Sequence, residues 1–288
     1  MKLCYNEGCA KGCSTLAEDI ELCEKYGFDF IEIDIDMLNE YLEEHTISEL
    51  SDWFKAHKLK PYGLAAVHIY QELFGAKDTR EKNEAFCERF ESALKNASAL
   101  DARNIIIVPP ISDGDIYLGF KDDIIDDCAN ALMNIADMAA KYDVRLAFEP
   151  VGVKNCAVRS IAVAKDILYI AYKDNLGLAP DAYNLYLNGG SNDFSDVAAL
   201  SANEIFAVHI MNADDVPAAE RGQDKRTFPD RGLAVNVPGF LNALKADGYD
   251  GMVSVETFRP EYYEKDNEWV ISEAYKSLKK VLADNNCL

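Results

Sequence analysis

Four short apolar stretches of the sequence each lead into a residue that can bind a metal ion. Residues 144–148 precede Glu149, residues 176–180 precede Asp181, residues 205–208 precede His209, and residues 252–255 precede Glu256. Carboxylates combined with one imidazole form a hard, mostly oxygen donor set that suits a single divalent cation such as Mn²⁺, Zn²⁺, Mg²⁺ or Co²⁺. One such residue after a strand is usually a solvated acid or a core histidine. Their recurrence after successive strands, in a chain with only 4 histidines, predicts one metal site.

The elements that must position these residues alternate regularly along the chain. Strand-like segments are expected at residues 3–6, 28–34, 60–67, 104–108, 144–148, 176–180, 205–208 and 252–255. Helical segments between them indicate parallel strands joined by crossover helices. Eight such units predict a closed (β/α)8 TIM barrel, in which active sites lie at the carboxyl ends of the strands. No low-complexity linker divides the sequence, so residues 1–288 are expected to form one domain.

Two helix boundaries are also predicted from local signals. A capping box near residues 14–18 indicates a helix that begins with Ser14 as its N-cap and runs to about Tyr26. Residues 38–57 are expected to form one helical region, with a new turn beginning near residue 48.

Composition restricts the partners and the compartment. The formal net charge of −21 opposes binding to DNA or RNA, whose affinity for proteins comes largely from Lys and Arg on phosphates. No run approaches the roughly 18 apolar residues of a membrane-spanning helix, and residues 1–7 are too short and polar for a signal peptide. The 8 cysteines have no C-x-x-C spacing, which indicates reduced thiols. A cytoplasmic protein is expected, either a monomer or a homo-oligomer.

The residues described so far resemble those of a known family. Glu149, Asp181, His209 and Glu256 match the metal quartet of the xylose-isomerase-like sugar isomerases and epimerases. Within that superfamily the chain most closely resembles the inosose (2-keto-myo-inositol) isomerases of inositol catabolism. Residues 1–7, 22–25, 31–33 and 253–256 carry this resemblance, together with the specific run Phe-Arg-Pro-Glu-Tyr-Tyr at 258–263. The resemblance extends over essentially the whole chain.

The resemblance implies a metal-dependent isomerase of carbohydrate metabolism that acts on a small polyol ketone or ketose. The metal would serve as Lewis acid and template. Of the two glutamates, Glu149 and Glu256, one would remove the proton next to the carbonyl to give an ene-diolate. The other would return a proton to the neighbouring carbon, so that the carbonyl moves along the ring.

Further substrate contacts are expected around the quartet. Arg226, in an Arg-x-x-Pro motif, is expected to anchor a substrate oxygen, although a solvated loop cation is the alternative. Asn184 stands where family members commonly have histidine, which leaves the exact substrate open. His68 and Glu32, on the third and second strands, are expected to face the substrate, with a packing role as the alternative for each.

Three other functions are compatible with parts of this pattern. A metal-dependent dehydratase of the inosose or 3-dehydroshikimate type would use the same quartet and then eliminate a hydroxyl group. A DNA-repair enzyme resembling AP endonucleases would need a three-zinc cluster with many histidines, which the 4 histidines and the charge of −21 oppose. A non-catalytic polyol-binding module would not need two glutamates at the metal.

Overall fold

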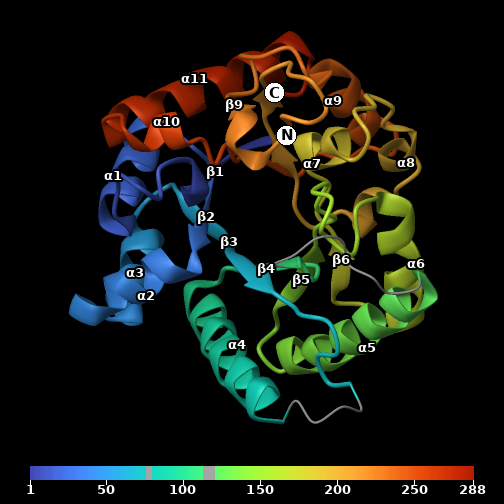
Figure 1. Ribbon diagram of the computed structural model, residues 1–288. Helices are drawn as coiled ribbons and strands as arrows, with labels where there is room; N and C mark the ends of the chain where they lie inside the picture. Colours follow the sequence, from blue (N-terminus) through green and yellow to red (C-terminus); the bar gives the residue numbers. More distant parts are fainter. Residues whose placement is uncertain (76–79, 113–120) are drawn as a thin grey trace.

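The chain folds into one eight-stranded parallel sheet that curls into a barrel (Figure 1). The computed structural model describes residues 1–75, 80–112 and 121–288. The barrel strands are β1 Lys2–Asn6, β2 Phe30–Asp34, β3 Lys60–His68, β4 Asn104–Val108, β5 Arg145–Phe148, β6 Leu176–Leu178, β7 His209–Ile210 and β10 Met252–Val255. Their order is β6-β5-β4-β3-β2-β1-β10-β7, and every neighbouring pair is parallel.

The two ends of this sheet meet through single bridges. Leu178 pairs in parallel with Ile205, and Asp181 pairs with His209. The amide of His209 donates to the Pro180 carbonyl at 3.0 Å. These contacts join β6 to the segment that leads into β7, so the ring closes and the predicted (β/α)8 barrel is confirmed.

The predicted seventh strand was placed too early in the chain. Residues 205–208 were expected to form it, but β7 begins at His209. The Phe206 carbonyl accepts a hydrogen bond from the Tyr62 hydroxyl at 2.6 Å. The ring of Phe206 occupies the space beside Gly177, where a Cβ would lie 2.5 Å from it. The backbone before His209 still contacts both neighbouring strands, because the Phe206 amide donates to the Leu178 carbonyl at 2.9 Å and the Val208 carbonyl accepts from the Ser254 amide at 2.8 Å. Regular pairing begins only at His209.

Helices surround the barrel on its outer side (Figure 1). They are α1 Leu16–Tyr26, α2 Ile35–Glu44, α3 Ile47–Ala56, α4 Arg80–Leu100, α5 Lys121–Ala140, α6 Ile161–Ala171, α7 Ala182–Leu187, α8 Ser195–Ala198, α9 Val237–Lys245, α10 Pro260–Tyr263 and α11 Asn267–Asp284. A short antiparallel pair, β8 Asn212–Ala213 and β9 Arg226–Thr227, follows β7. Within the described ranges, no helix has both the length and the apolar character needed to cross a membrane.

Capping residues explain two differences from the predicted helices. The N-cap of α1 is Thr15, not Ser14, because Thr15 and Glu18 form the reciprocal capping box. The Ser14 hydroxyl donates to Asp19 at 3.1 Å instead. The expected helical region at 38–57 is divided into α2 and α3, since Thr46 starts a second capping box with Glu49.

Alternation along the strands separates two sets of side chains. Tyr5 and Ile31 belong to the large apolar cluster shared with the helices, whereas Cys4 belongs to a smaller cluster of mostly small side chains. Residues two apart on a strand share a face. Asn6 therefore lies on the Cys4 face at the carboxyl end of β1, and Glu32 lies on the opposite face of β2 from Ile31. This arrangement directs polar side chains to the carboxyl mouth of the barrel.

Candidate metal centre

The four predicted metal ligands lie together at the carboxyl end of the barrel. One potential ligand atom from each of them lies within 4.8 Å of all the others. All four residues are buried, with exposed fractions between 0% and 4% for the residue as a whole. Each of them follows or begins a different strand: Glu149 follows β5, Asp181 follows β6, His209 begins β7 and Glu256 follows β10. Barrel closure thus brings together residues that are far apart in the sequence.

His209 lies next to both glutamates of this cluster. Its Nδ1 lies 3.4 Å from Glu149 Oε2 and 3.6 Å from Glu256 Oε2. This nitrogen is buried and has no hydrogen-bond partner within the described part of the chain. A buried polar atom without a partner costs free energy, and a cation shared with the two carboxylates would satisfy it.

Burial and mutual repulsion change the ionisation of the cluster. Burial raises the pKa of Asp181 and the pKa of Glu256, while the nearby Arg226 guanidinium opposes both shifts. Burial alone would lower the pKa of His209, but the surrounding carboxylates outweigh it and raise that pKa well above its ordinary value. Each of these groups would be stabilised in its ligating form by a divalent cation.

Arg226 lies directly behind two of the carboxylates. Its Nη1 donates to Asp181 Oδ2 and to Glu256 Oε2, each at 2.9 Å, and its side chain is 1% exposed. The same nitrogen donates to the Glu256 carbonyl at 3.1 Å. The solvated-loop alternative is therefore excluded, because the guanidinium is enclosed by protein groups. Its contact with a substrate oxygen stays a prediction.

Asn184 contacts two members of the cluster. Its backbone amide donates to Asp181 Oδ1 at 2.6 Å, which makes Asp181 the N-cap of α7. Its side-chain Nδ2 donates to Glu149 Oε1 at 2.8 Å. The residue is only 2% exposed. Position 184 thus adjoins the predicted ligands, while its contact with the substrate stays a prediction.

Glu32 lies on the other side of His209. It is fully buried, and its Oε2 is 3.2 Å from His209 Nε2. A carboxylate at the second nitrogen of a ligating imidazole orients the ring and fixes its tautomer. Glu32 is thus placed to orient His209, and its contact with the substrate stays a prediction.

Asn6 is a member of the site that the sequence analysis did not identify. Its Nδ2 donates to Glu256 Oε1 at 3.1 Å and to Glu32 Oε2 at 3.3 Å. The sequence does contain a signal for Asn6, because it stands at the end of the first expected strand, as the ligands stand at the ends of theirs. A search limited to metal-binding residue types passes over an amide.

A cavity of about 240 Å³ opens at this end of the barrel. Glu256 and His68 both line it, together with Asn6, Lys11, Asp34, Ile35, Asp36, Ala65, Ala66 and Phe258. His68 therefore faces the same space as a predicted ligand. A cavity of this size suits a small molecule rather than a polymer.

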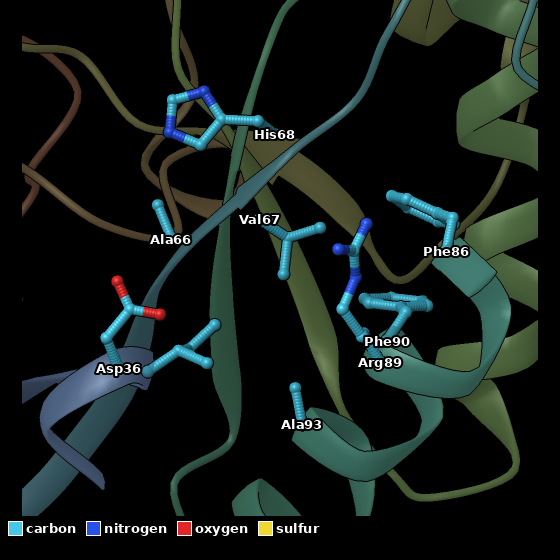
Figure 2. A pocket seen from close by; sticks show the side chains of 9 residues that line it. Asp36, Ala66, Val67, His68, Phe86, Arg89, Phe90 and Ala93 are labelled. Atoms are coloured by element: carbon cyan, nitrogen blue, oxygen red, sulfur yellow. The ribbon is translucent and has the colours of Figure 1, made fainter. Parts of the chain in front are cut away.

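A second cavity, of about 260 Å³, adjoins the first on the α4 side. The two share Ile35, Asp36, Ala66 and His68 as lining residues. Figure 2 shows Arg89 between Val67 and the rings of Phe86 and Phe90, while the His68 ring points away from them. The second cavity thus lies on the helix side of β3.

Comparison with known proteins agrees with this geometry. The family model described as xylose isomerase-like TIM barrel matches residues 20–281. Proteins named inosose isomerase from Halalkalibacterium halodurans and Bacillus velezensis are 34% and 33% identical over 284 residues, which cover 98% of this chain and 97% and 98% of theirs. The 1.8 Å crystal structure of an IOLI protein with a binding zinc atom matches with a TM-score of 0.90 and 32% identity over 99% of each chain. The chain belongs to the xylose isomerase-like TIM barrel family.

Proposed function

We propose that this protein is a divalent-metal-dependent inosose isomerase, which moves the carbonyl group of a cyclic polyol ketone to the neighbouring carbon. The observation that carries the proposal is the buried cluster of Glu149, Asp181, His209 and Glu256, with potential ligand atoms within 4.8 Å of one another. Relatives named inosose isomerase, similar over 98% of this chain, supply the substrate class.

The donor set of the cluster fits one divalent cation. Three carboxylates in one buried site repel one another, and Arg226 pairs directly with only two of them. His209 Nδ1 lacks a hydrogen-bond partner among the described residues. Zn²⁺ is favoured because the similar IOLI protein binds zinc. Mn²⁺, Mg²⁺ and Co²⁺ suit the same oxygen-rich set.

Two glutamates next to the same His209 nitrogen would carry the proton transfer. When bound, the cation supplies the Lewis acidity that makes a proton next to a carbonyl easier to remove. Glu149 Oε2 and Glu256 Oε2 lie 3.4 and 3.6 Å from the same His209 nitrogen, so both carboxylates would border a substrate bound at the metal. One carboxylate accepts the proton from the hydroxyl-bearing carbon, and the other returns a proton to the former carbonyl carbon. The hydroxyl proton moves to the other oxygen, and no oxidant is required.

The remaining residues orient these groups and enclose the substrate. Asn6 donates to Glu256 at 3.1 Å and Asn184 donates to Glu149 at 2.8 Å, which fixes one oxygen of each glutamate. His68 and Lys11 line the mouth cavity and are placed to contact polyol hydroxyl groups.

The proposed setting is the cytoplasm, without a nucleic-acid partner. All 8 cysteines are free thiols, which suits a reducing compartment. The formal net charge of −21 disfavours contact with a phosphate backbone.

Product analysis with Zn²⁺-loaded protein tests the proposed function. Each inosose isomer is incubated with the protein, and the mixture is followed by NMR and by ultraviolet absorbance. The expected result is a second inosose without a new ultraviolet band. A conjugated diketone would instead identify a dehydratase, and binding without turnover of any inosose or ketose would identify a binding module.

A further inference from the structure

A chain of hydrogen bonds connects Arg226 with Glu149 through two amide side chains. Arg226 Nε donates to Gln223 Oε1 at 2.6 Å. Gln223 Nε2 donates to Asn184 Oδ1 at 2.8 Å, and Asn184 Nδ2 donates to Glu149 Oε1 at 2.8 Å. Gln223 touches no member of the metal quartet in these contacts, yet it joins two residues that do.

The arginine fixes the direction of the whole chain. A guanidinium only donates hydrogen bonds, so Gln223 must present its oxygen to Arg226 and its amino group to Asn184. Asn184 must then present its amino group to Glu149, which accepts when ionised. Turning either amide around would place two donors or two acceptors against each other. The orientation of both amides is therefore determined by the network.

The backbone around Gln223 is held in place. Gln223 begins a 3₁₀ turn, Gln223–Lys225, and the backbone amide of Arg226 donates to the Gln223 carbonyl. The Tyr183 hydroxyl donates to the neighbouring Gly222 carbonyl at 2.9 Å. The turn therefore presents Gln223 and Arg226 together, rather than as two independent loop side chains.

Arg226 thereby contacts every carboxylate of the quartet, directly or through the amides. Its Nη1 reaches Asp181 and Glu256, each at 2.9 Å. Its Nε reaches Glu149 only by way of Gln223 and Asn184. The Glu149 oxygen held by Asn184 is Oε1, which leaves Oε2 facing His209 Nδ1 at 3.4 Å.

We propose that Gln223 is a positioning residue for Glu149, which acts through Asn184 and sets the direction of its carboxylate. This inference rests on the proposed function for its catalytic consequence, but not for its effect on metal binding. The backbone amide of Gly152 is a second donor to Asn184 Oδ1, at 3.4 Å. Because that contact is long, loss of Gln223 leaves the Asn184 amide only weakly oriented.

The first test uses Zn²⁺ alone as the probe. Gln223→Glu keeps the size and the acceptor for Arg226 but removes the donor to Asn184. It should weaken Zn²⁺ binding about 10- to 100-fold, as is typical for partners of metal ligands, in competition with a chromophoric chelator. Gln71→Glu makes the same chemical change at an exposed turn and should stay within about 2-fold of wild type. Gln223→Leu repeats the test if Gln223→Glu does not fold.

A double-mutant cycle shows whether the amides act as a unit. Asn184→Ala, Gln223→Ala and the double variant are compared by Zn²⁺ affinity and by kcat and KM for an inosose. The double variant should lose no more Zn²⁺ affinity and no more kcat than the more impaired single variant, because each single change already breaks the chain of hydrogen bonds. In each, kcat should fall more than KM rises, and the melting temperature of the zinc-free protein should change little.

Two results would overturn the proposal. One is a Gln223→Glu variant with wild-type Zn²⁺ affinity and kcat. The other is a double variant whose fold-loss of Zn²⁺ affinity and kcat equals the product of the two single losses. Failure of the proposed function would give a different result, because the wild-type protein would then bind Zn²⁺ but turn over no inosose. The double-mutant cycle measured by Zn²⁺ affinity would still decide the role of Gln223.

Discussion

Arg226 and Glu256 form a buried ion pair within the predicted metal centre. Nη1 of the arginine lies 2.9 Å from Oε2 of the glutamate, and the two side chains are 1% and 5% exposed. Removing one partner of a buried pair leaves an uncompensated charge, which is strongly destabilising. The guanidinium beside the cluster thus carries part of the charge compensation that a metal would complete.

Replacement of Arg226 should therefore affect the metal-free protein most. In Arg226→Met, Asp181 and Glu256 lose the guanidinium that they share at 2.9 Å. We expect the melting temperature to fall by many degrees after chelation and by much less with Zn²⁺ bound, because the metal replaces the missing charge. Differential scanning fluorimetry with and without Zn²⁺ measures both states. An equal fall in melting temperature in the zinc-free and the zinc-bound protein would contradict this account of Arg226.

Proton transfer should depend on both glutamates. Glu149→Gln and Glu256→Gln each remove a carboxylate base and should reduce solvent deuterium incorporation next to the carbonyl by at least about 100-fold. Circular dichroism and metal content should show that the variants remain folded and how much metal they hold. Glu84→Gln, at an exposed position on α4, is the matched control and should behave as wild type. Undiminished exchange in either site variant would refute its acid or base role.

Chelation should remove activity and also lower stability. A ligand that binds only the folded state stabilises it in proportion to the logarithm of its concentration over Kd. Treatment with EDTA followed by dialysis should therefore lower the melting temperature by several degrees, and added Zn²⁺ should restore it. The measurement of melting temperature requires no substrate. Full turnover in protein shown to be metal-free would exclude the Lewis-acid role.

A buried carboxyl group outside the metal centre should make stability depend on pH. Burial raises the pKa of Asp19 to about 7, although Asn267 and Ser14 donate to it. The folded state holds this proton more tightly than the unfolded state. The protonated carboxyl group therefore stabilises the folded state at low pH, and this stabilisation is lost as pH rises toward 7. Urea unfolding from pH 5 to pH 8 should show stability falling with rising pH.

Asp19→Asn tests the assignment of that pH dependence. An amide cannot ionise, so the fall in stability between pH 5 and pH 8 should be reduced. Asp52→Asn, at an exposed position on α3, should leave the wild-type slope unchanged. A wild-type slope in Asp19→Asn would mean that another group, such as the buried Glu7, is responsible.

Much of the fold and the quartet could be predicted because both follow local rules. Alternating apolar strands and helices predict the barrel, and a position directly after a strand predicts which face of the barrel a side chain reaches. Glu149 and Glu256 are 107 residues apart by their numbers, yet each is located by its own strand. Closure of the ring then brings them together.

The contacts behind the quartet could not be predicted in the same way. Gln223 meets Asn184 across 39 residues, from a loop without periodic pattern. Arg226 was identified by its motif, but its position beneath Asp181 and Glu256 depends on the short β8–β9 pair. The bond from the Tyr62 hydroxyl to the Phe206 carbonyl, just before β7, spans 144 residues and is also outside the reach of local rules.

Anomalous diffraction from crystals of the Zn²⁺-loaded protein tests the central claim most directly. Data collected on both sides of the zinc absorption edge locate the metal without reference to activity. The account predicts one strong peak at about 2.0–2.2 Å from ligand atoms of Glu149, Asp181, His209 and Glu256. A peak elsewhere, with none at the quartet, would contradict it.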